Sequence, residues 1–261
     1  STGSVNQDAG FSIVSYTGNG TGNSTIGHSL GATPKFIIVK NLTTTQDWGT
    51  YSPSFVSASD PNVLYLSKTD GEADHTNVWG TSAAFNNNTF TVGDWTGSNQ
   101  SGSSFIAYCF TDVQGFSKFS NYTGNGNADG TFVYTGFKPA FVMVKSTGSG
   151  GWLINDVKRS PHNITGLTLY ADSTASEESY TGGASEWDFL SNGFKNRDAG
   201  SAQNTSGTSY IYMAFAENPF TTSTGVPATA RWWLRKMLPD SRQKEINILF
   251  KKIIHTLIII N

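Results

Sequence analysis

Apolar and polar positions alternate along several short segments of this chain. Between residues 11 and 16, apolar residues are interleaved with small polar ones, a period of two that is typical of a β-strand with one wet face. Gly18, Asn19 and Gly20 follow, and such residues accept the positive φ angles of tight turns. Residues 116–122 and 124–126 show the same sequence of features. The pattern predicts strands joined by tight turns.

Other segments are apolar without interruption. Residues 36–39 and 141–144 are short apolar runs, each with a proline before it and a lysine after it, as expected for strands buried on both faces. Residues 105–110 and 210–215 have the same character. Because no amphipathic crossover helix separates these runs, they favour an antiparallel sandwich or jelly roll over a parallel sheet.

The chain also repeats itself. Residues 10–20 match 115–126, with one residue inserted before Tyr122, and the pairs 34–40 with 139–145 and 101–110 with 206–215 match as well. The offset stays at about 104 to 106 residues, which indicates a duplication. We expect an all-β fold of two tandem β-sandwich, jelly-roll-like repeats followed by an amphipathic helix. The predicted boundaries are a leader (1–9), two repeats (10–114 and 115–220), a linker (221–239) and the helix (240–261).

The C-terminal segment differs in charge from the rest. Residues 231–261 hold 7 of the 17 Lys and Arg but 2 of the 19 Asp and Glu, which leaves 10 against 17 before them. From Ile246 to Ile258 apolar residues recur at helical spacing, with lysines on the other face. Three interpretations stay open: a helix docked on the β body or foreign to it, an oligomerising helix, or a helix that lies on a membrane surface.

The amino-acid composition restricts the classes of function that the chain can have. The 28 glycines and the 13% of aromatic residues suit strands and turns, and a net charge of -2 gives no attraction to nucleic acid. A single cysteine, Cys109, excludes an internal disulfide and a cysteine zinc site, and its apolar surroundings indicate a buried thiol. Residues 1–6 have neither a basic start nor an apolar stretch, so we expect no signal peptide. We also expect no membrane partner.

Few residues suggest chemistry. The four histidines are scattered, and no nucleophile elbow, phosphate loop or dinucleotide fingerprint is present, so we expect no enzyme. Glu186 and Asp188 flank Trp187 and are the only pair that we consider for glycoside hydrolysis, although a solvated strand face explains them better.

An acidic loop is a candidate metal site. Asp70, Glu72 and Asp74 stand at alternate positions, as calcium ligands often do. The loop lacks the central glycine and the final glutamate of an EF-hand, and a solvated loop is the alternative. Calcium is therefore the one cofactor that the sequence suggests.

Tryptophans are candidates for sugar binding, because aromatic rings can stack on sugar rings. Trp79, Trp95 and Trp187 stand beside polar, glycine-rich segments and are the predicted ligand-binding residues. Trp48 and Trp152 occupy equivalent repeat positions, which for large apolar rings indicates core.

Several motifs, taken together, resemble a family of uncharacterised proteins that is abundant in tailed bacteriophages, notably marine ones. They lie at residues 10–20, 30–40, 122–126, 134–139, 188–194 and 214–220. In that family the unit often follows a lectin-like sandwich domain in longer virion or tail-fibre polypeptides. The resemblance covers residues 10–231, and the helix beyond departs from it.

The resemblance implies a structural or adhesion role at the virion surface or in the tail, hence a virion or extracellular location. The expected partners are other virion proteins, further copies of this chain, for instance in a homotrimer, and a cell-surface glycan. A carbohydrate-binding module is the alternative, and a glycoside hydrolase is the third interpretation.

Overall fold

The structure is a computed structural model that describes residues 1–218 except 56–60, 180–185 and 201. Almost all regular structure in this part is antiparallel β-sheet, which confirms the predicted all-β class. The helical segments in it are the single turns α1 (Thr76–Trp79) and α2 (Thr96–Asn99). The predicted linker and C-terminal helix lie outside the described residues.

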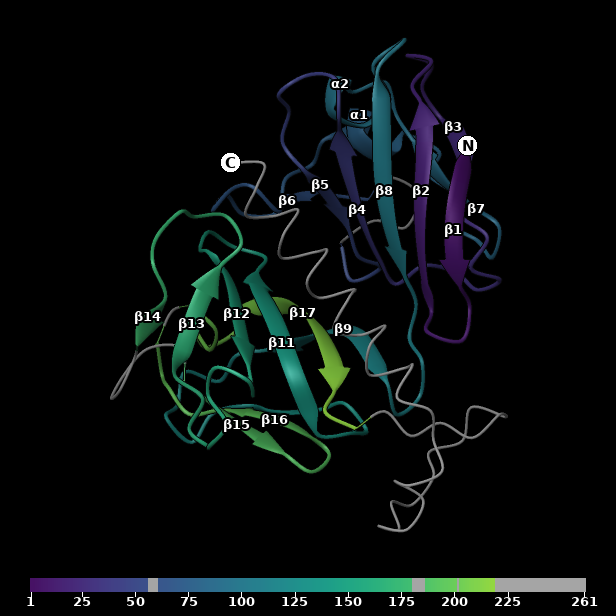
Figure 1. Cartoon of the computed structure of the whole chain (residues 1–261). Coiled ribbons are helices and arrows are strands. Elements are labelled where there is room, and N and C mark those ends of the chain that lie inside the picture. Colours follow the sequence, from purple (N-terminus) through teal and green to yellow (C-terminus); the bar gives the residue numbers. More distant parts are fainter. Residues whose placement is uncertain (56–60, 180–185, 201, 219–261) are drawn as a thin grey trace.

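Each repeat contains one large sheet (Figure 1). The first sheet has six strands in the order β1 (Thr2–Asn6), β2 (Phe11–Thr17), β8 (Ser104–Phe110), β4 (Phe36–Asn41), β5 (Gly49–Tyr51) and β6 (Leu64–Tyr65). The second, also six-stranded, has the order β14 (Glu178–Ser179), β13 (Leu167–Tyr170), β12 (Trp152–Asp156), β11 (Pro139–Ser146), β17 (Ser209–Ala216) and β9 (Ser117–Thr123).

A small sheet accompanies each large one. In the first repeat β3 (Ser24–Gly27) pairs with β7 (Thr89–Val92). In the second, β10 (Phe132–Tyr134), β16 (Gly193–Asn196) and β15 (Trp187–Leu190) form a three-stranded sheet in that order.

The strand order repeats between the halves. The series β2, β8, β4, β5, β6 of the first sheet corresponds to β9, β17, β11, β12, β13 of the second. The edges differ, because β1 extends the first sheet and β14 the second. Residues 1–9, predicted as a leader, thus include an edge strand that pairs with β2 over its whole length.

The register also corrects the sequence alignment at the start of each repeat. Tyr16 pairs with Phe105 in the first sheet, as Tyr122 pairs with Tyr210 in the second. Both ladders run without a break back to Phe11 and Ser117, so Phe11 corresponds to Ser117 and not to Phe116. The extra residue therefore precedes β9 instead of lying inside it. The prediction was wrong because two adjacent motifs, each well matched, imply offsets that differ by one.

The central strands have two apolar faces, as their uninterrupted apolar character predicts. All of β4 is buried, and its side chains alternate between two clusters. Ile37 and Val39 point into the core of the first repeat, whereas Phe36 and Ile38 point toward the second repeat. In β11 the same alternation sends Phe141 and Met143 toward the first repeat.

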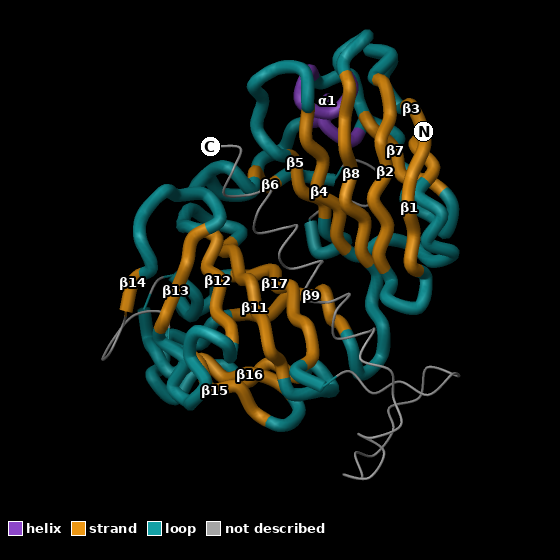
Figure 2. The backbone as a smooth tube through the Cα atoms, in the orientation of Figure 1, coloured by secondary structure: helices purple, strands orange, loops and turns teal. Residues whose placement is uncertain are grey.

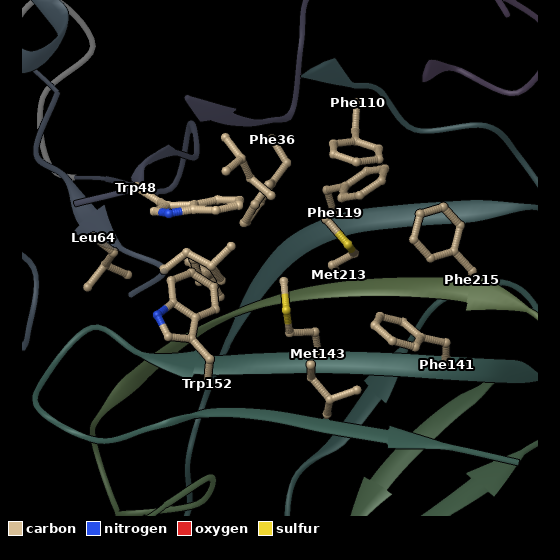
Figure 3. Close-up of a cluster of buried hydrophobic side chains, with 14 of the residues drawn as sticks. Phe36, Trp48, Leu64, Phe110, Phe119, Phe141, Met143, Trp152, Met213 and Phe215 are labelled. Carbon is tan, nitrogen blue, oxygen red and sulfur yellow. The ribbon is translucent and has the colours of Figure 1, made fainter. Parts of the chain in front are cut away.

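The faces that the repeats turn toward each other form one shared core (Figure 3). Phe36 packs edge to face on Trp152 at 6.4 Å between ring centroids. Phe110 and Phe215, which are equivalent positions, also meet edge to face at 6.4 Å. The buried members of this shared core are Phe36, Ile38, Trp48, Phe55, Leu64, Leu66 and Phe110 from the first repeat, with Phe116, Phe119, Phe141, Met143, Trp152, Ile154, Ile211, Met213 and Phe215 from the second.

The Tyr-Thr-Gly-Asn-Gly motif is part of a turn that a buried asparagine holds in place. In the second repeat the side-chain amide of Asn204 donates to Asn125 Oδ1, to the Asn127 carbonyl and to the Asp198 carbonyl at 2.8–3.0 Å. Its Oδ1 accepts from the Asn125 backbone N–H at 3.0 Å. Asn99 makes the same set of bonds in the first repeat, with Asn19, Thr21 and Gly93.

Glycines let the chain pass close to this asparagine. A Cβ on Gly18 would lie 2.3 Å from the Gln100 carbonyl oxygen, and Gly124 faces the Thr205 carbonyl oxygen equally closely. Gly20 and Gly126 have φ angles of 70° and 67°, which glycine accepts without strain. The motif recurs because this backbone path requires these residues, and the predicted positive φ angles are found at Gly20 and Gly126. The predicted tight turns are not formed, since the N–H groups of Gly20 and Gly126 bond to the carbonyls of Asn99 and Asn204 in a distant segment.

Hydrogen bonds reinforce the contact between the repeats at one edge. The Trp152 indole Nε1 donates to the Tyr65 carbonyl at 2.9 Å, and the Gly150 N–H donates to the Thr69 carbonyl at 2.8 Å. The Glu72 N–H donates to the Thr147 carbonyl at 2.6 Å. The loop after β6 is thereby fastened to the turn between β11 and β12, and Figure 2 shows these segments side by side.

Lys145 is fully buried under this contact. Its ammonium donates to the Gly148 carbonyl at 3.1 Å and to the Thr69 carbonyl at 3.4 Å. Burial disfavours the charged form and lowers the pKa of Lys145 to about 8, although the carboxylates of Asp172 and Asp70 act in the opposite direction. Keeping the Lys145 amine charged in this buried position at neutral pH lowers the stability of the folded protein.

Truncation of the shared core is expected to be strongly destabilising. Phe215→Ala removes a ring that contacts both repeats and should lower the free energy of unfolding by about 3–5 kcal/mol. Phe132→Ala, on a strand surface, is the matched control and should change it by less than about 1 kcal/mol. Urea unfolding measures both, and equal effects would contradict a shared core centred on Phe215.

The burial of Lys145 predicts a pH dependence of stability. Below pH 8 the amine is protonated in both states, whereas between pH 8 and 10.5 only the unfolded state keeps its proton. Stability should therefore rise with pH across this window, by about 2 kcal/mol between pH 7 and 9.5. Lys145→Met should remove this rise in urea titrations. The same slope in both proteins would show that another group causes it.

Candidate functional site

Two of the three predicted sugar-binding tryptophans are core residues. Trp79 and Trp187 are both 0% exposed. Trp79 packs edge to face on Tyr51 and Phe85, and Trp187 donates from Nε1 to Asn196 Oδ1 at 2.6 Å. Neither ring presents a face to solvent, so the prediction that these two bind a ligand is wrong. Residues from other elements, Tyr51, Phe85 and Asn196, contact these rings, which the neighbouring residues in sequence do not reveal.

The other three tryptophans of the described residues lie in two kinds of environment. Trp48 and Trp152 lie in the shared core, which confirms their interpretation as core. Trp95 is half-buried, with its ring 5.5 Å from that of Tyr65 and against Gly97. A ligand-binding role for Trp95 stays a prediction.

The acidic loop does not bring its carboxylates together into a ligand set. Glu72 Oε1 accepts a hydrogen bond from Asn62 Nδ2 at 2.9 Å, while Asp70 and Asp74 are exposed. Within the described residues, no group of three or more His, Cys, Asp or Glu side chains is placed to hold a metal ion. Backbone contacts of this loop instead fasten the two repeats to each other.

Glu186 and Asp188, the two carboxylates considered for glycoside hydrolysis, lie in different environments. Glu186 is 9% exposed, whereas Asp188 forms an ion pair with Arg197, Oδ2 to Nε, at 3.3 Å. A glycosidase needs both carboxyl groups open to one substrate cleft. These two positions do not match that requirement.

A more suitable surface lies on the outer side of the small sheet β10–β16–β15. Val133 points inward, so its neighbours Phe132 and Tyr134 point outward, and their side chains are 44% and 65% exposed. Directly across from them on β16 are Lys195 and Gly193. We call this surface the aromatic face; it comprises Phe132, Tyr134, Gly193, Lys195 and Asp188. Figure 1 shows β15 and β16 at the end of the second repeat that is remote from the first.

Glycines leave room for both rings. A Cβ on Gly193 would lie 3.1 Å from Phe132 Cε2, so the Phe132 ring leans over this glycine. A Cβ on Gly136 would lie 3.7–3.9 Å from the hydroxyl and ring edge of Tyr134, so the tip of this ring lies near that glycine.

Ion pairs border the rings. Lys195 Nζ lies 2.6 Å from Asp129 Oδ1, and Arg197 contacts the same oxygen at 3.3 Å as well as Asp188. The hydrogen bond from Lys195 holds the pKa of Asp129 below its usual value. Two cations and two anions therefore form a charge-balanced border of hydrogen-bonding groups beside the aromatic face.

The first repeat lacks this arrangement. Phe90 and Phe194 are equivalent, and their partners Ile26 and Val133 align the two small sheets. Thr25 and Gly27 then stand where the second repeat has Phe132 and Tyr134. The exposed rings are therefore no requirement of the duplicated fold.

Three large exposed apolar side chains, Phe132, Tyr134 and Ile164, lie on or beside this sheet, whereas Val5 and Leu42 belong to the first repeat. In the described part of the chain these are the large exposed apolar side chains. Ile164 lies beyond β15, because Thr165 bridges to Trp187 and Asn163 bonds to Phe189. Sequence reasoning missed the aromatic face, although the comparison of Thr25 and Gly27 with Phe132 and Tyr134 could have revealed it.

None of the described helices is long and apolar enough to cross a membrane. Neither the curated proteins nor the solved structures that we searched include a significant match. A family model described as "Domain of unknown function (DUF7483)" matches residues 1–219. The match spans both repeats and every strand named above, and the chain belongs to this DUF7483 family.

Proposed function

We propose that this chain is a non-catalytic structural or adhesion module of a bacteriophage virion, in a tail or surface fibre. The observation that carries the proposal is the shared core, in which each large sheet covers an apolar face of the other. This construction joins two copies of one unit into a single body and leaves the small sheets and turns to make contacts. The phage assignment itself rests on the resemblance of the motifs.

The way in which the motifs are used supports a structural role. The asparagine turns and the aromatic strands recur in both repeats, and in both they hold the fold together. Asp188 is already engaged in an ion pair and Glu186 is almost wholly buried, which disfavours a hydrolase.

Carbohydrate binding is the second candidate. One observation favours it, namely the two exposed rings beside a charge-balanced polar border on β10 and β16. An adhesion module that binds a glycan would unite both candidates.

The virion assignment is tested with particles of a phage that encodes this sequence. After density-gradient purification, peptide mass spectrometry should find the chain in stoichiometric amounts, and immunogold labelling should place it on the tail or surface. Recovery of the protein only from the soluble lysate, with the particles free of it, would contradict the proposal. A known capsid protein serves as the positive control and a phage-encoded cytoplasmic enzyme as the negative one.

A further inference from the structure

We infer that the aromatic face binds the apolar side of an uncharged sugar ring. The inference rests on the proposed adhesion function and names its ligand class. It assigns the contact to Phe132 and Tyr134 instead of the tryptophans that the sequence suggests.

The chemistry of the two rings suits a sugar. An aromatic face carries partial negative charge, and it attracts the C–H groups on the apolar side of a pyranose. Phe132 and Tyr134 are two residues apart on one strand, so their rings lie on the same side of the sheet. Two neighbouring rings can contact two successive sugar units of an oligosaccharide.

The aromatic face is built on regular backbone. The Phe132 ring leans over Gly193, and both rings project from a paired strand instead of a loop. The backbone that carries the rings is therefore in place before a ligand binds, which lowers the ordering cost of binding.

The charges beside the rings favour an uncharged ligand. Lys195 and Arg197 are each already paired with Asp129 or Asp188, so the border offers N–H donors and carboxylate acceptors without net charge. Adjacent hydroxyl groups of a neutral sugar can use donors and acceptors together. An acidic sugar gains little, because its charge would have to compete with Asp129 and Asp188.

The two repeats differ at the positions of the exposed rings. Thr25 and Gly27 occupy these positions in the first repeat, whose small sheet folds without exposed rings. Exposed large apolar groups carry a risk of aggregation, and the presence of two exposed aromatic rings at these positions in the second repeat alone points to a use. Two rings and one isoleucine are also few for a stable protein interface, which buries about 800 Å² on each partner.

The test is an array of bacterial surface polysaccharides and their oligosaccharides, both neutral and acidic. It compares the full chain with the double variant Phe132→Ser, Tyr134→Ser. Leu42→Ser is the matched control, because Leu42 is 54% exposed but lies in the first repeat. Both altered surfaces are exposed, so unfolding midpoints close to that of the unaltered chain should show that all the proteins are folded.

We expect neutral glycans to bind the unaltered chain and the Leu42→Ser control equally. Affinity should fall by about tenfold or more in the double variant, since both stacking contacts are lost. Tyr134→Phe keeps the ring and should keep most of the affinity.

Three results would overturn the inference: no glycan bound by the unaltered chain, equal binding by the double variant, or binding of acidic glycans alone. Self-association that the double variant abolishes, measured as mass in solution, would also overturn it, because a second copy would then occupy the face. The particle experiment is independent of this one. A chain present in virions that binds no glycan overturns only this inference, and a glycan-binding chain absent from virions overturns only the virion proposal.

Discussion

Each large sheet of this protein has two apolar faces, and its own repeat covers only one of them. Phe36 and Ile38 on β4, like Phe141 and Met143 on β11, would lie in water if either repeat stood alone. Burial of apolar surface is the dominant favourable term in folding, so the exposed second face would be costly. Each repeat buries the second apolar face of the other. The arrangement of the rest of the chain follows from that mutual cover.

Because each large sheet is buried by the other, some positions are constrained by packing and others are free to differ between the repeats. The central strands, the rings between the sheets and the asparagine turns have corresponding residues in both repeats. The outer sides of the small sheets do not take part in the shared core, and there the repeats differ. Phe132 and Tyr134 on one side and Thr25 and Gly27 on the other show this difference at equivalent positions. A duplicated scaffold can thus carry a contact surface on one copy while the shared core keeps its own residues.

The sequence predicts what depends on local pattern. The strands, their two apolar faces and the core position of Trp48 and Trp152 could be inferred from periodicity and repetition. The exposure of individual aromatic rings could not be inferred in this way. Trp79 and Trp187 stand beside polar residues in sequence, yet Tyr51 and Asn196, which come from other strands, cover them. Residues 132–134 are apolar without interruption, so their pattern does not show which side of this strand faces the core, because that depends on how the small sheet packs.

The most direct test of the account is native-state hydrogen exchange in rising, sub-denaturing urea, since it measures the opening of each strand separately. If the shared core joins the repeats into one cooperative unit, the slowest backbone amides of β8 and β17 converge on the same free energy of unfolding and the same urea dependence. Separate plateaus, with one sheet opening while the other stays protected, would show that each repeat is stable without the other, and the account would be wrong.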